Sequence, residues 1–153
     1  MFDLSEIIGI SPYSLSKTEK TDLYMKGISS LTKMHYDGCP QYKRILDTTG
    51  FDLNNITKIE DFPFLPVRLF KEYELLSVER SDVIKTMTSS GTTGQQVSKI
   101  YLNRETATNQ TKVLAKITSS FIGTKRLPLL VIDSKSVTKD RNLFSARGAG
   151  ILG

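Results

Sequence analysis

Residues 88–94 place five hydroxyl side chains and two glycines in seven consecutive positions, Thr88-Ser89-Ser90-Gly91-Thr92-Thr93-Gly94. Strand-like patterns flank the segment over residues 83–87 and 97–102, so we expect it to join two strands as a hairpin loop. Glycine reaches positive φ without a steric penalty, which lets successive backbone N–H groups converge on an anion. The hydroxyls add donors, and Lys99 would add a positive charge. The segment is therefore a candidate phosphate-binding loop.

Two alternatives bear on this loop. The P-loop pattern G-x-x-x-x-G-K-[ST] is absent, because the segment has no Gly-Lys pair and no helical pattern directly behind it. Serine, threonine and glycine also mark plain turns between strands. Composition alone leaves the phosphate site and the plain turn both open.

The composition predicts a folded domain without a membrane span. The chain has 153 residues, of which 39% are hydrophobic and 24% charged, and no apolar run approaches the roughly 20 residues that cross a bilayer. The net charge of +5 is spread along the chain, so we expect no nucleic-acid partner. The acidic start gives no secretory signal, and the single cysteine, Cys39, favours the cytoplasm and a buried, unreactive side chain.

The first part of the chain has helical patterns. Ser16 and Glu19 form a capping-box signature that predicts a helix over residues 17–36. Pro40 favours the start of a second, shorter helix, which Gly50 would end. The prolines in the apolar segment that follows exclude a continuous helix there. We therefore expect a helical segment and connector over 1–66 and a second domain over 67–153.

The second part predicts strands and one helix, which together indicate the α/β class. After the two strands of the hairpin, Asn103 would cap a helix that Gly123 ends, and its apolar side chains share one face: Ala107, Val113, Leu114, Ile117 and Phe121. The apolar run at 127–133 favours a buried strand with Asp133 at its carboxyl end, where open α/β sheets gather ligands. Asp133 is interpreted either as a turn cap or as a Mg²⁺ ligand.

The loop and its surroundings resemble a known family. Thr88-Ser89-Ser90-Gly91-Thr92-Thr93-Gly94 is similar to the phosphate-binding signature of adenylate-forming enzymes. Together with the segments at 64–71, 98–102, 127–137 and 144–153, it resembles the LuxE-type acyl-protein synthetases. The resemblance covers most of the chain from about Phe62 onward, and it implies part of an adenylate-forming mixed sheet with flanking helices.

The resemblance also implies an activity. Members of the family activate a fatty acid with ATP and Mg²⁺ as an acyl-adenylate, and then pass the acyl group to a protein thiol. It implies an acyl-acceptor protein or reductase as a partner. Carried over by position, the phosphate-binding residues are Thr88, Ser89, Ser90, Gly91, Thr92, Thr93, Gly94 and Lys99, and a weaker assignment places Arg147, Gly148 and Gly150 at the acyl or adenylate pocket.

Three features of the sequence differ from what the resemblance implies. The superfamily commonly places a lysine three residues after the last loop glycine, where this chain has Val97, and Lys99 is the nearest lysine. Cys39 lies far upstream of the family's acyl-accepting cysteine and is not expected to take its role. Because the sequence stops within a resembling segment, we interpret it as an N-terminal portion with little activity alone.

His35, the only histidine, is expected to end a helix, where its positive charge would be favourable.

A second functional class stays open. The helical start and the partial sheet would also suit a non-catalytic docking or oligomerisation module that keeps a vestigial loop. Exposed sheet edges and uncovered apolar faces favour self-association, so a homo-oligomer is compatible with either class.

Overall fold

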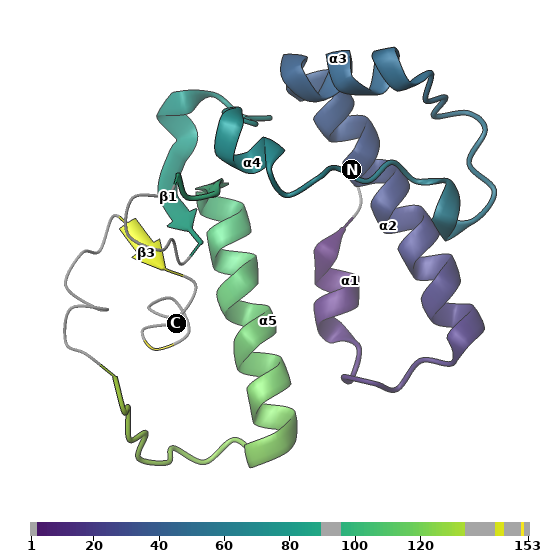
Figure 1. The fold of residues 1–153 in the computed structure, drawn as a ribbon. Coiled ribbons are helices and arrows are strands. Elements are labelled where there is room, and N and C mark those ends of the chain that lie inside the picture. The colour runs from purple at the N-terminus through teal and green to yellow at the C-terminus, as the bar shows by residue number, and fades with distance from the viewer. Residues whose placement is uncertain (1–2, 90–95, 134–142, 146–150, 152–153) are drawn as a thin grey trace. The chain divides into compact units, whose positions relative to one another are not determined.

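A computed structural model of the chain describes residues 3–89, 96–133, 143–145 and 151 (Figure 1). Helices and a small sheet make up the fold, so the predicted α/β class is confirmed. The chain forms two compact units, one of Met1–Pro66 with Leu75–Val78 and one of Val67–Glu74 with Glu79–Gly153. The chain therefore returns to the first unit over four residues before it completes the second.

The first unit is helical, with α1 (Leu4–Gly9), α2 (Lys17–Gly38), α3 (Pro40–Thr49) and the short 3-10 helix η1 (Ile59–Asp61). The capping box predicted for α2 is present, because the Ser16 hydroxyl accepts from the Glu19 N–H at 3.3 Å and the Glu19 carboxylate accepts from the Ser16 N–H at 2.8 Å. The helix runs two residues beyond the predicted end at position 36.

The buried residues of this unit lie on α2, on α3 and at the junction between them. Cys39 connects the two helices, and Pro40 opens α3 as predicted. Gly50 ends α3 in the left-handed conformation, with φ of 69°, which glycine adopts without strain. Cys39 and Leu46 are each only 1% exposed, so the prediction of a buried cysteine is confirmed.

The segment Leu75–Val78 packs on α2 through Ser77. The His35 Nδ1 lies 2.6 Å from the Ser77 hydroxyl oxygen. A Cβ placed on Gly38 would lie 2.9 Å from the backbone oxygen of Ser77, so the close approach of these two backbones requires glycine. The last turn of α2 thus holds a segment about forty positions away in the sequence.

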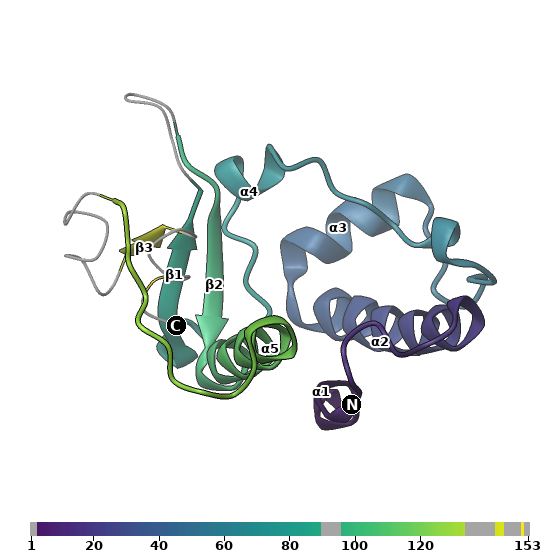
Figure 2. The ribbon, with the colours of Figure 1, turned by 90° about the horizontal axis from the view of Figure 1, so that it is seen from below.

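The second unit contains α4 (Leu69–Glu72), the 3-10 helix η2 (Arg80–Asp82), β1 (Val83–Thr88), β2 (Lys99–Asn103), α5 (Arg104–Ile122) and β3 (Leu143–Ser145). The strand order is β2-β1-β3, with β2 antiparallel and β3 parallel to β1. Figure 2 shows β1 and β2 side by side and α5 continuing directly from β2. Both predicted strands of the hairpin are confirmed, although β2 begins two residues later than predicted.

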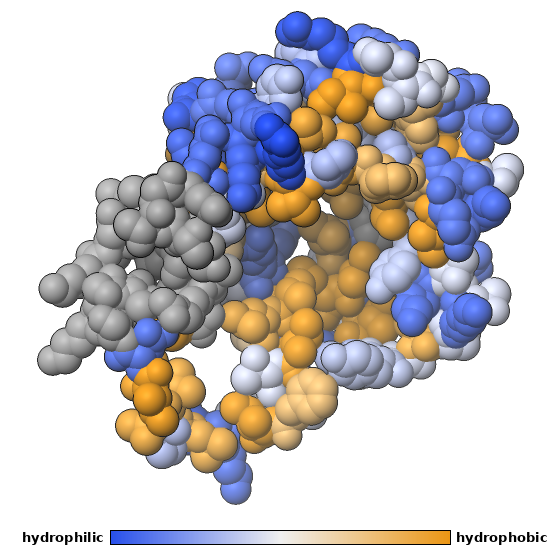
Figure 3. Space-filling model, in the orientation of Figure 1, coloured by the Kyte–Doolittle hydropathy of each residue, from blue (hydrophilic) through white to orange (hydrophobic). Residues whose placement is uncertain are grey.

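Helix α5 begins and ends as predicted. The Asn103 side-chain oxygen accepts from the Thr106 N–H at 2.9 Å, and Gly123 follows the helix with φ of 80°. The predicted apolar face is largely uncovered, since Val113, Leu114, Ile117 and Phe121 are all exposed. Figure 3 shows apolar surface over α5 and over the segment that follows it. None of the helices within the described ranges is long and apolar enough to cross a membrane.

The strand predicted at 127–133 is wrong. These residues form no strand, and the run is exposed, with Leu130 at 85% and Ile132 at 92%. The three-stranded sheet, in the order β2-β1-β3, does not include this run. The apolar composition of the run therefore did not decide its place in the sheet.

Candidate functional site

The predicted phosphate loop lies between β1 and β2 in the sequence. The two strands pair in antiparallel register up to Thr88, which lies opposite Lys99. Thr88, Ser89 and Lys99 of the predicted site are described by the structure. The other predicted site residues lie outside the described residues: Ser90, Gly91, Thr92, Thr93, Gly94, Arg147, Gly148 and Gly150.

Four residues, Thr88, Ser89, Ser98 and Lys99, form what we call the hairpin neck. The Ser89 N–H donates to the Ser98 carbonyl oxygen at 3.1 Å, and the Ser98 N–H donates to the Ser89 hydroxyl oxygen at 3.0 Å. Because the Ser89 oxygen accepts this N–H, its own hydrogen must point to another acceptor. Ser89 is exposed, so that acceptor can be a group that arrives from solvent.

Ser98 is a neck residue that the sequence analysis did not assign to the site. It is only 8% exposed, and its hydroxyl oxygen is buried with no hydrogen-bond partner within the described part of the chain. A buried hydroxyl without a partner is unfavourable, so such a group in a folded protein asks for an explanation. No signal in the sequence separates this serine from the other hydroxyl residues nearby.

Lys99 occupies an exposed position at the start of β2. Side chains alternate between the two faces of a strand, and directly paired residues share a face. Lys99 therefore shares a face of the hairpin with Thr88, whereas the neighbouring Ser98 lies toward the other face. The ammonium and the buried hydroxyl do not form one cluster.

A second cation lies over the face that carries Lys99. Tyr101 follows Lys99 by two positions, and the guanidinium carbon of Arg80 lies 5.1 Å from the centre of the Tyr101 ring. Arg80 also forms an ion pair with Glu74, which offsets its charge. The sequence analysis did not predict this stacking, since it depends on how η2 packs beside β2. Among the neck residues, Lys99 thus supplies the positive charge.

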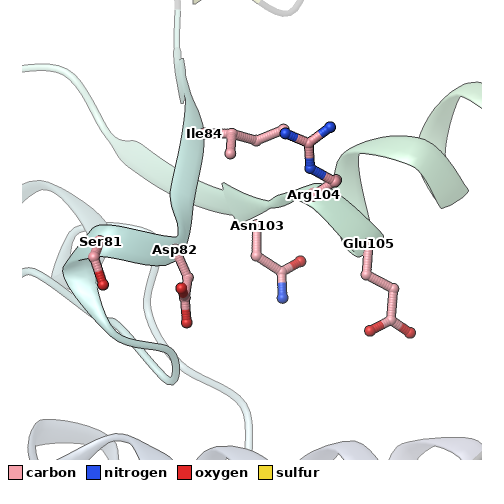
Figure 4. A pocket seen from close by; sticks show the side chains of 6 residues that line it. All are labelled: Ser81, Asp82, Ile84, Asn103, Arg104 and Glu105. Carbon is pink, nitrogen blue, oxygen red and sulfur yellow. The ribbon is translucent and has the colours of Figure 1, made fainter.

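An open depression of about 360 Å³ lies at the other end of the hairpin (Figure 4). It is lined by Ser81, Asp82, Ile84, Asn103, Arg104 and Glu105. Because β1 runs from Val83 to Thr88, the length of a strand, roughly 17–20 Å, separates this depression from the neck. Two of its lining residues are carboxylates, which repel phosphate. The depression is therefore not the predicted phosphate site.

The prediction for His35 is confirmed in its position on the helix but not in its charge. The residue does lie in the last turn of α2, but its ring packs edge-on against Tyr42 and contacts Ser77. Although part of the residue remains exposed, desolvation lowers the pKa of His35, which favours the neutral ring over the positive charge that we expected. Both interpretations of Asp133, as a turn cap and as a metal ligand, stay predictions, because the neighbouring Ser134 lies outside the described residues.

No group of histidine, cysteine or acidic residues suited to a metal occurs in residues 3–89, 96–133, 143–145 and 151. Thr88, Ser89, Ser98 and Lys99 include no acidic side chain, and their side chains offer three hydroxyls and one ammonium. This donor set fits an anion.

Comparisons with known proteins point to one family. The family model described as acyl-protein synthetase, LuxE, matches residues 3–148. A long-chain-fatty-acid–luciferin-component ligase from Photorhabdus luminescens is 30% identical over 88 residues, which are 58% of this chain and 75% of that protein.

A more distant relative is also a ligase. A phenylacetate-coenzyme A ligase from Thermus thermophilus is 28% identical over 110 residues, which are 68% of this chain. The matched part is 24% of that protein, so the chain spans about a quarter of it. No solved structure matches the chain.

Proposed function

Because the chain belongs to the LuxE family of acyl-protein synthetases, we propose that it serves the ATP-dependent activation of a fatty acid and the transfer of the acyl group to a protein thiol. The names of the two relatives, a fatty-acid ligase and a phenylacetate-coenzyme A ligase, support an acyl-activating ligase. The hairpin neck is the structural observation that carries the proposal further.

In the proposed reaction, a carboxylate oxygen of the fatty acid attacks the α-phosphorus of ATP, and pyrophosphate leaves. A thiolate of the acceptor protein then attacks the acyl carbon, and AMP leaves. Negative charge grows on the pyrophosphate during the first step, so donors that hold the β- and γ-phosphates lower the barrier. Mg²⁺, bound to the phosphates, would neutralise part of that charge.

The neck supplies such donors. Ser89 has its oxygen held by the Ser98 N–H and its hydrogen free for an acceptor from solvent, and Lys99 is exposed on the same hairpin. We assign the β- and γ-phosphates to Ser89 and to the loop residues Ser90, Gly91, Thr92, Thr93 and Gly94, with Lys99 as the nearby cation. Arg147, Gly148 and Gly150 stay proposed for the acyl or adenylate pocket. The single buried thiol suits a protein that works in the reducing cytoplasm.

ATP–pyrophosphate exchange with a panel of fatty acids tests the reaction. We expect exchange that depends on a fatty acid, and its absence from the longest natural form of the protein would contradict the ligase proposal. For the loop, ATP binding is measured on Ser89→Ala and on Thr92→Ala with Thr93→Ala. Both should bind ATP about tenfold or more weakly, since charge-assisted hydrogen bonds are lost. Ser120→Ala, which removes an exposed hydroxyl of α5, serves as the control.

The uncovered face of α5 favours a second candidate function, a docking or oligomerisation module. Val113, Leu114, Ile117 and Phe121 expose an apolar strip larger than solitary surface residues would give. Size-exclusion chromatography with light scattering tests self-association through this strip. A dimer that Leu114→Glu dissociates, together with no nucleotide binding, would favour the module over the ligase.

A further inference from the structure

The two serines of the hairpin neck have unequal environments. Ser89 is exposed, whereas Ser98 is 8% exposed. An anion that arrives from solvent can therefore reach the Ser89 hydroxyl but not the Ser98 hydroxyl. Two hydrogen bonds nevertheless join the two residues. The Ser98 N–H donates to the Ser89 hydroxyl oxygen at 3.0 Å, and the Ser89 N–H donates to the Ser98 carbonyl oxygen at 3.1 Å.

A suitable acceptor, the Ser89 hydroxyl oxygen, lies beside the backbone of Ser98. A serine oxygen is attached three bonds from its own backbone nitrogen, and in Ser98 that nitrogen is 3.0 Å from the Ser89 oxygen. A hydroxyl oxygen can accept two hydrogen bonds, of which Ser89 uses one for the Ser98 N–H. A change of staggered rotamer would bring the Ser98 hydroxyl toward the second position.

We propose that Ser98 is a positioning residue for Ser89. Ser98 donates its hydroxyl hydrogen to the Ser89 oxygen when Ser89 donates its own hydroxyl hydrogen to a bound phosphate. Hydrogen bonds in a chain polarise one another, so an oxygen that donates to an anion becomes a better acceptor. This chain of donors explains why a buried position with no hydrogen-bond partner in the described residues holds serine. The inference rests on the proposed function, because it requires phosphate at the neck.

A double-mutant cycle between Ser89→Ala and Ser98→Ala tests the inference on the full chain, with ATP and inorganic pyrophosphate as the probes. Calorimetry gives the affinities, and thermal unfolding without ligand gives the Tm. We expect Ser98→Ala to weaken binding about fivefold, the worth of an ordinary hydrogen bond, while its Tm stays equal or rises because an unpaired polar group is removed. When Ser89 is already alanine, Ser98→Ala should not weaken the binding of ATP or of pyrophosphate any further.

Each other outcome is decisive. A lower Tm for Ser98→Ala would overturn the inference, because the hydroxyl would already be paired in the free protein. Unchanged affinity, or an effect that adds fully to that of Ser89→Ala, would also overturn it. An unaltered chain that binds neither probe would overturn the proposed phosphate site itself, and Ser120→Ala should behave as the unaltered chain throughout.

Discussion

The Nδ1 atom of His35 lies 2.6 Å from the hydroxyl oxygen of Ser77, and this contact joins α2 to Leu75–Val78 across 42 positions of the sequence. The chain leaves the first unit after Pro66 and returns to it in this segment. The only histidine of the chain thus has a structural role, which makes pH a probe of this contact.

We expect the first unit to lose stability on acidification through His35. Desolvation lowers the pKa of His35 below the 6.5 of an exposed histidine, so the unfolded chain takes up this proton first. The contribution of neutral His35 to the stability of the first unit is complete above pH 6.5. It is lost as the pH falls through the lower pKa that His35 has in the folded state. Urea unfolding between pH 7.5 and pH 5 measures it, with His35→Gln as the control. An equal acid loss in His35→Gln would contradict this assignment.

Gly38→Ala is expected to destabilise the first unit by about 1–3 kcal/mol, the usual range for a forced overlap. The new Cβ would lie 2.9 Å from the Ser77 backbone oxygen, which cannot move aside as a flexible side chain would. Gly9→Ala is the matched control, because a Cβ there meets nothing within 4 Å. Urea unfolding of both variants decides, and equal stabilities would show that Ser77 is not held against α2.

Leu46→Ala should cost about 2–5 kcal/mol, because the side chain is 1% exposed and its removal leaves a cavity in the small core of the first unit. Leu31→Ala, at a position 42% exposed on α2, should cost about 1 kcal/mol or less. Both free energies follow from chemical unfolding. Similar losses at the two positions would place the core of the unit elsewhere.

Cys39 should resist alkylation in the folded protein, since the residue is 1% exposed. Labelling by iodoacetamide is expected to be slow in buffer and to accelerate in urea across the unfolding transition, because the reagent reaches the thiol only when the unit unfolds. Mass spectrometry follows the single modification. Labelling in buffer at the rate seen in urea would show an accessible thiol and reopen an acceptor role.

Local signals in the sequence predicted the ends of the helices well. Ser16 with Glu19, Pro40, Gly50 and Asn103 each satisfy or restrict the backbone within a few residues, so their effect needs no distant partner. The hairpin was likewise predictable, because both of its strands and its loop are contiguous in the sequence.

Features that depend on distant packing were not predictable. The apolar run at 127–133 has the composition of a buried strand, but it is exposed and pairs with none of β1, β2 and β3. The neutral preference of His35 depends on Ser77 and Tyr42, one of them 42 positions away. The burial of Ser98 depends on how the neck closes, since its sequence neighbours Val97 and Lys99 are both more exposed.

The chain crosses between the two units after Pro66, after Glu74 and again after Val78. The helical unit is therefore assembled from two stretches of the gene with part of the other unit encoded between them. An exchange of residues 1–66 as a cassette would separate His35 from the native Ser77 segment that it contacts, so the first unit cannot be transplanted as one continuous stretch.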